Sequence, residues 1–456
     1  MKPVAVVICT YNKCNYVINC INSVLESSFN DFDIIVVDNA SSDNTVDMIK
    51  SKFGNKLTLL VNEKNTGGAG GFHRGMAYAM QKKYKYIHLL DNDVVVDKNA
   101  IKALYDFMEL HPNAGACGSL ILHMAFPETV QDYGAMIDIP NLGVKPLYAG
   151  AGIKSELPDF LACDYVAACS AMFRASALEV SGLIEEDYFI YWDDMALGWK
   201  LRLAGYKIFA CKASVIWHEQ GRQGLYSPFF IYYIFRNKIH TFVKYCTESE
   251  YNDFVKNLTT RLFRTFAVNR KRPAAIYTCF HALHDALEGV RGKGDDYKIN
   301  KTPDADFFFL DKVNNSSKLL ILFDSSFTTL ELFIEKLRAS LPDLHITLYT
   351  VDDCFAMPEG IIVQNEMPNL NDYDMLIKMC PHVLDLPNYD RRYVYLDKYW
   401  NQLVDEDDFY LVENYEALHM FYYNIFFPYI KSKLDVRRGV CKTLINHTNT
   451  PNTAKP

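Results

Sequence analysis

The sequence has no long uncharged apolar stretch and no excess of basic residues. No run of about 18 apolar residues occurs, so no membrane-spanning helix is predicted. The formal net charge is −8, which argues against a general nucleic-acid-binding protein, because such a protein needs a basic face. The N-terminus runs directly into a strand-like segment without a signal peptide. A cytoplasmic protein is therefore expected, in contact at most with the inner face of the cytoplasmic membrane.

Paired cysteine motifs are also missing. The 12 cysteines are scattered and include no C-x-x-C pair. Several of them, such as Cys163, Cys169 and Cys211, fall within apolar stretches. Buried reduced thiols are therefore predicted, rather than a disulfide framework or a zinc site.

Strands and helices alternate in the first part of the chain. Val4–Thr10 is a continuous apolar run, typical of a strand buried on both faces. Further strand-like runs cover 33–38, 57–61 and 86–90, with helical spacing between them. This alternation predicts an α/β fold with a mostly parallel, Rossmann-like sheet and helices on both faces.

Polar side chains follow the ends of these predicted strands. Thr10, Asp38, Asn65 and Asp91 each lie at or just past a strand end. Ligands bind at the carboxyl ends of parallel strands, so these residues are expected to share one crevice. Asp91 and Asp93 place two carboxylates beside buried apolar runs, which is costly unless a cation sits on them. A divalent metal that bridges a diphosphate is a natural candidate.

The rest of the chain suggests further units. The 456 residues suffice for about two to four domains. Residues 226–300 are predicted to be mostly helical, after a first domain over 1–225. A second pattern of alternating strands and helices predicts a small α/β domain over 301–456.

A glycine-rich segment follows the third predicted strand. Residues 67–75 contain five glycines, and a helix is predicted to begin near Gly71. The segment is neither of the two common phosphate loops, because Met76 and His73 stand where those loops need Lys and Gly. Its backbone N–H groups are candidates for anion binding, with Arg74 adding a bidentate contact. A flexible tight turn is the alternative.

Seven short motifs occur in one order along about residues 1–245. They are Thr10-Tyr11-Asn12, Val37 to Asp43, Asn65 to Gly75, Asp91-Asn92-Asp93, Trp192-Asp193-Asp194, Gly205-Tyr206-Lys207 and Trp217-His218. The ordered set resembles the inverting glycosyltransferases of family 2, which have the GT-A fold. Within that family it looks most like the bacterial galactofuranosyltransferases, with the rhamnosyltransferases a close second.

The resemblance implies roles on the donor side. Asp38 would accept the N3–H of a uracil, although a turn or helix-capping role is the alternative. Asp91, Asp93 and His218 would hold Mn²⁺ or Mg²⁺, with Asp91 nearer the sugar or ribose. The other residues expected to bind the nucleotide sugar are Thr10, Tyr11, Asn65, Gly67, Gly68 and Arg74.

The resemblance implies a second set of roles on the acceptor side. Asp194 would be the general base that inversion requires, and Asp193 would position the acceptor. The alternative for both is a cap at the start of a helix. The family usually has a further acid two residues after the base, where this chain has Ala196. The segment from Tyr232 to Asn237 resembles a family segment near the acceptor.

The expected activity is transfer of galactofuranose from UDP-galactofuranose to a lipid-linked or surface glycan such as capsule, O-antigen or cell-wall polymer. A dTDP-rhamnose donor and an inactive nucleotide-binding scaffold are the alternatives. A sugar-phosphate nucleotidyltransferase is disfavoured, because Cys9 to Lys13 lack its basic glycine-rich signature. The aromatic stretches 229–244 and 421–433 leave three options open, which are core packing, a membrane contact and a homo-oligomer contact.

Overall fold

The computed structural model describes residues 2–219, 227–268, 273–299, 313, 317–322, 330–350, 360–379, 390, 392–396 and 415–448. The N-terminal part contains a ten-stranded mixed sheet with the strand order β10-β12-β6-β11-β4-β1-β2-β3, in which β5 pairs with β12 and β7 with β6. The strands are β1 Val4–Thr10, β2 Phe32–Asp38, β3 Thr58–Val61, β4 Tyr86–Asp91, β5 Val94–Val96, β6 Ala114–His123, β7 Val130–Asp132, β10 Phe160–Cys163, β11 Ser170–Arg174 and β12 Lys207–His218.

The expected parallel sheet is present at one end of this arrangement. Strands β3, β2, β1 and β4 are parallel neighbours, and the apolar runs of β1, β2 and β4 are buried on both faces, whereas the edge strand β3 is partly exposed. The antiparallel strand β11 separates this set from the parallel pair β6 and β12. The predicted α/β fold of the GT-A type is confirmed, and the antiparallel strands β5, β7, β10 and β11 make the sheet mixed.

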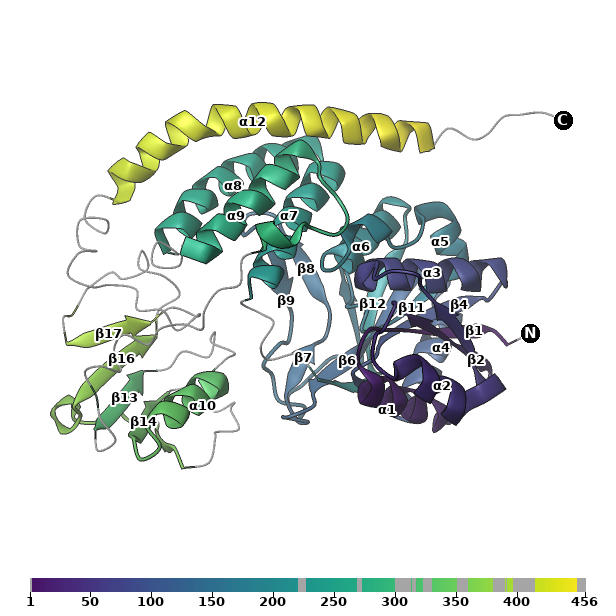
Figure 1. Ribbon diagram of the computed structural model, residues 1–456, viewed down its shortest axis with the longest axis horizontal. Helices are drawn as coiled ribbons and strands as arrows, with labels where there is room; N and C mark the ends of the chain where they lie inside the picture. Colours follow the sequence, from purple (N-terminus) through teal and green to yellow (C-terminus); the bar gives the residue numbers. More distant parts are fainter. Residues whose placement is uncertain are drawn as a thin grey trace.

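Helices cover both faces of the sheet (Figure 1). One core layer packs under three helices on one face, and a second core layer packs under three helices on the other face. The first set is α3 Gly67–Gln81, α5 Ala175–Ser181 and α6 Asp193–Leu203, and the second is α1 Cys14–Leu25, α2 Thr45–Phe53 and α4 Ala100–Leu110. Both faces of the central strands are therefore shielded from solvent, which explains their unbroken apolar runs.

The glycine-rich segment is helical, and the predicted start near Gly71 is wrong. Helix α3 begins at Gly67. A Cβ at Gly71 would lie 2.1 Å from Cys9 Sγ, and one at Gly75 would lie 2.3 Å from Val7 Cγ1. The glycines therefore let this helix pack closely against strand β1. Low intrinsic helix propensity is overridden here by tertiary packing.

Four long helices form a second layer, drawn above the sheet in Figure 1. They are α7 Pro228–Tyr245, α8 Glu248–Val268, α9 Pro273–Glu288 and α12 Tyr415–Thr448. The core layer beneath α3 and α6 continues into this layer through residues such as Phe242, Phe254 and Leu434. Tyr232, Tyr233 and Phe242 are fully buried, so the aromatic stretch 229–244 is a core helix.

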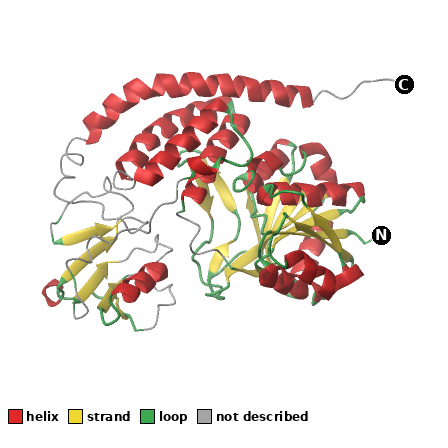
Figure 2. Ribbon diagram, viewed as in Figure 1, coloured by secondary structure: helices red, strands yellow, loops and turns green. Residues whose placement is uncertain are grey.

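A smaller parallel sheet with its own core lies in the C-terminal part (Figure 2). Its strand order is β15-β14-β13-β16-β17, and helix α10 packs on it. The bounds are β13 Lys318–Leu322, α10 Leu330–Ser340, β14 His345–Tyr349, β15 Ile362–Gln364, β16 Met375–Met379 and β17 Tyr393–Leu396. The short elements are the hairpin β8 Ala135–Asp138 and β9 Gly143–Pro146 and the 3₁₀ turns Gly54–Lys56, Glu186–Tyr188, Asp296–Lys298 and Leu370–Asp372.

Two expectations based on composition can be compared with the described residues. The ten cysteines that the structure describes are all free, and eight of them are buried. None of the helices described combines the length and apolar character needed to cross a bilayer.

Candidate active site

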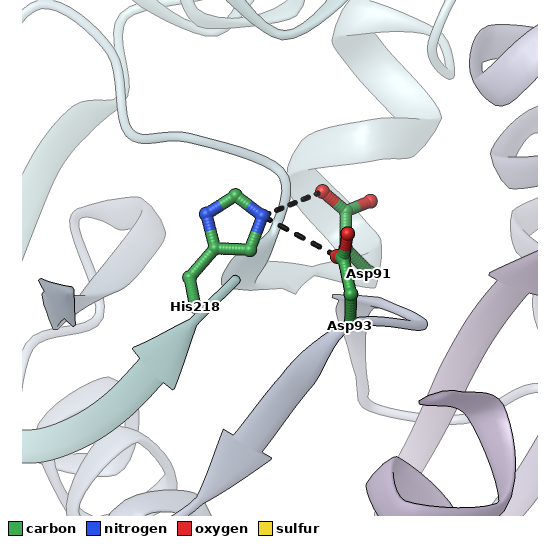
Figure 3. A group of neighbouring side chains, drawn as sticks. All are labelled: Asp91, Asp93 and His218. Atoms are coloured by element: carbon green, nitrogen blue, oxygen red, sulfur yellow. Dashed lines mark ion pairs between the residues drawn. The ribbon is translucent and has the colours of Figure 1, made fainter. Parts of the chain in front are cut away.

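The first part of the site is a corner formed by Asp91, Asp93 and His218 (Figure 3). Strand β4 ends at Asp91, and β5 begins at Val94 after a tight turn. Strand β12 pairs with β5 so that His218 lies opposite Val94, which brings its ring beside Asp93. His218 Nε2 is 3.3 Å from Asp93 Oδ1 and 3.9 Å from Asp91 Oδ2. Residues distant in sequence thus meet because of strand register.

This corner fits a divalent cation. One ligand atom from each of the three residues lies within 4.8 Å of the others. Burial raises the pKa of Asp91, and the neighbouring Asp93 raises it further. No described lysine or arginine forms an ion pair with either carboxylate. Two carboxylates and one imidazole suit Mn²⁺ or Mg²⁺, with the nitrogen favouring Mn²⁺.

Asp38 ends strand β2, and its carboxylate is fully buried. Its Oδ2 accepts a hydrogen bond from Ser41 N at 2.9 Å. Its Oδ1 is buried and has no hydrogen-bond partner. The turn role therefore accounts for one oxygen only, and the other can accept a donor from a ligand.

The segment around Asn65 is organised by a residue that the sequence analysis missed. Asn39 is 2% exposed, and its Nδ2 donates to Gly67 O at 2.7 Å and to Asn65 Oδ1 at 3.1 Å. Its Oδ1 accepts from Thr66 N at 3.0 Å. Asn65 Oδ1 also accepts from Gly67 N at 2.8 Å. The sequence analysis included Asn39 only as a member of the Val37 to Asp43 motif and gave it no role.

The remaining donor-side residues have different surroundings. Thr10 Oγ1 accepts a hydrogen bond from Asn92 Nδ2 at 2.9 Å, which ties β1 to the acidic turn. Tyr11 is 43% exposed. Gly68 has open space where a Cβ would stand. Arg74 donates to Val61 O at 2.8 Å and to Asn62 Oδ1, so its guanidinium holds the end of β3.

Asp193 and Asp194 begin helix α6, where the sequence analysis placed them. Asp194 Oδ1 accepts from Met195 N at 2.8 Å, and Oδ2 accepts from Ala168 N at 3.3 Å. Burial raises the pKa of both carboxyls, and Asp194 raises that of Asp193 further. Ala196 is fully buried on the same helix, so a side chain there faces the core.

These groups converge at one end of the sheet. Cys9, near the end of β1, is partly buried, and the pKa of its thiol is raised first by desolvation and then by Asp91, Asp38 and Asp193. Carboxylates from β2, β4 and α6 thus act on one thiol. Asp38, Asp91 and Asp193 therefore lie toward the same end of the sheet, and the shared crevice stays a prediction.

Strand β7 adds two further residues that the sequence analysis missed. Gln131 Nε2 lies 3.0 Å from His218 Nδ1. Burial raises the pKa of Asp132 to about 6, and Asp194 adds to that rise. The sequence offered no sign of this, because β7 is a three-residue strand in an irregular region.

Helix α7 contributes a third missed group. Asn237 is fully buried, and its Nδ2 donates to the carbonyl oxygens of Tyr188, Ile190 and Tyr191 at 2.9, 2.8 and 3.0 Å. The turn that it contacts leads directly into Asp193. Resemblance had placed the Tyr232 to Asn237 segment near the acceptor without giving this contact.

The fold and the site together define an α/β protein of the GT-A type with an acidic, metal-compatible group of side chains at the strand ends. Residues 5–180 match the family model described as Glycosyl transferase family 2. The likeness to this family thus lies in residues 5–180, and the prediction of a glycosyltransferase is confirmed at the level of this matched region.

The similar proteins include two bacterial relatives. Poly-beta-1,6-N-acetyl-D-glucosamine synthase of Staphylococcus aureus is 25% identical over 209 residues, which are 46% of this chain and 48% of the relative. Glycosyltransferase GlyG of Streptococcus pneumoniae is 30% identical over 104 residues, 22% of this chain and 34% of the relative. The match thus spans less than half the length of either relative.

Solved structures show a partial likeness. S. aureus TarS aligns with a TM-score of 0.43 and 19% identity, over 64% of this chain and 49% of that one. The mannosyltransferase PcManGT from Pyrobaculum calidifontis, in complex with GDP-Man and Mn²⁺, aligns with a TM-score of 0.39 and 14% identity, over 63% and 75%.

Proposed function

We propose that this protein is an inverting glycosyltransferase that moves a sugar from a nucleoside diphosphate donor to a hydroxyl group of a bacterial surface glycan. The observation that carries the proposal is the convergence of three acidic groups at the strand ends, of which Asp38, Asp91 and Asp93 lie within the matched residues 5–180. They are Asp38, the corner of Asp91, Asp93 and His218, and the pair of Asp193 and Asp194.

On the donor side, Asp38 binds the nucleobase of the donor. The corner of Asp91, Asp93 and His218 binds the diphosphate through a cation. The unpaired Oδ1 of Asp38 has the chemistry to accept the N3–H of uracil. A divalent cation bound by Asp91, Asp93 and His218 would neutralise charge that develops on the leaving diphosphate. The open space at Gly68 leaves the start of α3 accessible to the donor.

On the acceptor side, Asp194 is the group proposed to remove the proton of the attacking hydroxyl. Its two oxygens are held by backbone N–H groups of Met195 and Ala168, which fix the orientation of the carboxylate. A raised pKa makes a carboxylate a better base near neutral pH. Asp193 is proposed to position the acceptor.

For the donor sugar we propose galactofuranose carried by UDP, on the motif resemblance. A dTDP-rhamnose donor is the alternative, and the name of the similar S. aureus synthase adds N-acetylglucosamine to the candidate sugars. The test is a screen of UDP- and dTDP-sugars with Mn²⁺ and Mg²⁺, with a bacterial glycan acceptor, that measures released nucleotide and glycosylated product. No turnover with any donor would favour an inactive nucleotide-binding scaffold.

The outer face of α12 supports a contact beyond this crevice. Phe421, Ile425 and Tyr429 are 68%, 51% and 55% exposed and follow one another at four-residue spacing, so they share one helix face. Lys431, which is partly buried and pairs with Asp435, follows Tyr429 by two residues. We propose that this face binds the membrane surface that carries the acceptor, because exposed aromatic side chains beside a lysine are typical of interfacial helices.

Vesicle sedimentation tests this contact. We expect the wild-type protein to sediment with vesicles that contain anionic phospholipid. The double variant Phe421→Ser, Ile425→Ser should stay in the supernatant. Leu110→Ser is the control, because Leu110 is 76% exposed on α4. If the double variant instead turns a dimer into a monomer and sediments like the wild type, the face is a homo-oligomer contact.

A further inference from the structure

Gln131 lies against the side of the His218 ring that faces away from the acidic corner. Gln131 Nε2 is 3.0 Å from His218 Nδ1. The opposite ring nitrogen, Nε2, faces Asp91 and Asp93 (Figure 3). The contact follows from strand register, because β7 pairs with β6 at Leu122 and β6 pairs with β12 at His218. His218 is thus held between a carboxylate pair and one amide.

The chemistry of imidazole makes this contact decisive for cation binding. A neutral histidine carries its proton on one ring nitrogen and a lone pair on the other. Nε2 can bind a cation beside Asp91 and Asp93 only if its lone pair faces them. The proton must then be on Nδ1, where it needs an acceptor. Gln131 is the side chain at hydrogen-bond distance from that nitrogen.

The two ends of the Gln131 amide have opposite consequences. An amide nitrogen that donates to Nδ1 drives the ring proton to Nε2, which blocks the lone pair needed for a cation. In that arrangement Gln131 Oε1 is buried and has no hydrogen-bond partner. A half-turn of the amide exchanges nitrogen and oxygen with almost no change in shape. This rotation brings Gln131 Oε1 to the Nδ1–H of His218. No hydrogen bond of Oε1 is lost, because Oε1 has none before the rotation.

We propose that Gln131 is a positioning residue for the cation site, whose Oε1 accepts the Nδ1–H of His218 and so directs the Nε2 lone pair toward Asp91 and Asp93. This inference rests on the proposed function in one respect, namely that the acidic corner binds a divalent cation. It assigns no catalytic role to Gln131. It gives the short strand β7 a function that its position in the sequence does not suggest.

Binding of Mn²⁺ alone tests the role of the amide. The variant Gln131→Met keeps the length of the side chain and removes both hydrogen-bonding groups. We expect it to weaken Mn²⁺ binding by roughly 10- to 100-fold, the usual effect of losing such an orienting partner. Gln131→Glu should restore binding to the wild-type level or tighter, because a carboxylate can only accept. Electron paramagnetic resonance of free Mn²⁺ measures each affinity without donor or acceptor.

Two controls make the result specific. Glu128→Gln changes a side chain that is 71% exposed near β7 and should leave Mn²⁺ binding unchanged. Thermal unfolding shows whether Gln131→Met is folded. Nitrogen NMR of ¹⁵N-histidine-labelled wild-type protein with Mg²⁺ reads the tautomer directly, with the His218 signals assigned by their loss in His218→Asn. We expect the proton on Nδ1.

The outcomes separate this inference from the proposed reaction. Unchanged or tighter Mn²⁺ binding by Gln131→Met, or a proton on Nε2 in the Mg²⁺-loaded protein, would overturn the role of Gln131. Failure of every sugar donor in the screen would count against transferase activity alone. The loss with Gln131→Met and its recovery with Gln131→Glu would support the inference whichever donor is used.

Discussion

The side-chain amide of Asn237 donates to the carbonyl oxygen of Tyr191 at 3.0 Å, two residues before Asp193. Phe189, Tyr191 and Trp192 all have positive φ angles, of 66°, 63° and 68°. Bulky residues adopt this conformation only when their surroundings enforce it, at about 1–3 kcal/mol each. The turn that presents Asp193 and Asp194 is therefore strained, and Asn237 is one of the groups that hold it.

Asn237→Ala removes three hydrogen bonds to this turn, and among the described residues only Tyr188 O has other donors, from Arg236 and Ile190 N. We expect a loss of stability of about 1–3 kcal/mol and a fall in kcat of tenfold or more. Binding of the donor should change little, because Asp38 and the acidic corner lie on other elements. Calorimetric titration with UDP and steady-state kinetics would separate the two effects.

Asn252→Ala is the matched control for this variant. Asn252 is an exposed asparagine on α8 whose Nδ2 donates to Glu248 O only at the helix surface. It should keep wild-type kcat and stability. An Asn237→Ala protein with normal kcat and a raised KM for the donor would contradict the positioning role.

Asp194→Asn tests the assignment of the base. The amide keeps the size of the carboxylate and can still accept the hydrogen bond from Met195 N or Ala168 N, but it cannot take a proton. Transfer should fall by at least about 100-fold, while the affinity for UDP stays within about twofold. The control Asp106→Asn, on α4, should change neither transfer nor the affinity for UDP. Wild-type turnover by Asp194→Asn would exclude it as the base.

Asp38→Ala tests the recognition of the base of the donor. In the wild-type protein, Asp38 Oδ2 accepts a hydrogen bond from Ser41 N, and Oδ1 has no hydrogen-bond partner. Its loss should weaken UDP binding by roughly 10- to 100-fold, the range for a hydrogen bond to a charged group. Asp38→Asn should give a smaller effect, because its single carbonyl oxygen can serve the turn or the base. Equal UDP affinity in all three proteins would show that Asp38 serves only the turn.

The sequence predicted the parallel strands and the acidic residues at their ends, because long apolar runs followed by polar side chains carry a strong local signal. It also gave Asp193 and Asp194 at the start of a helix. It could not give Asn39, Gln131 or Asn237, since each acts through contacts with residues far along the chain. The start of α3 was misplaced, because glycine indicates a loop unless a neighbouring strand requires close packing.

Gly67 and Gly68 offer a paired test of the close contact between the start of α3 and the turn at Phe189. A Cβ at Gly67, where φ is +75°, would lie 1.9 Å from Phe189 O. Gly67→Ala should therefore destabilise the protein by about 2 kcal/mol or more. A Cβ at Gly68 meets nothing within 4 Å, so Gly68→Ala should leave the melting temperature unchanged or raise it slightly.

Kinetics add a second measurement on the same pair. If the donor approaches the start of α3 closely, Gly68→Ala should raise the KM for the nucleotide sugar while the protein stays folded. Equal thermal stability of the two alanine variants would show that the close contact between Gly67 and the turn at Phe189 is not maintained in solution.

Asp132 gives the protein a pH-dependent term in its stability. Burial and the nearby Asp194 raise the pKa of its carboxyl to about 6, whereas an unfolded chain has about 3.9. The folded state therefore binds this proton more tightly than the unfolded state. The resulting stability is present at low pH and is lost as the pH rises through about 6. The variant Asp132→Asn cannot ionise at this position, so its stability should not fall in this way as the pH rises.

The expected result is a difference that depends on pH. In metal-free protein, Asp132→Asn should melt at a higher temperature than the wild type at pH 7.5, and the difference should shrink as the pH falls below about 6 and vanish only near about pH 4, where the wild-type carboxyl is protonated in both the folded and the unfolded state. The amide can still accept the hydrogen bond that Asp132 Oδ1 receives from Gly134 N at 2.8 Å. Glu128→Gln, which alters an exposed carboxylate, should give a difference that is small and constant over the same range. A constant difference for Asp132→Asn as well would mean that Asp132 is solvated in solution and that the acidic groups beside it do not share a buried crevice.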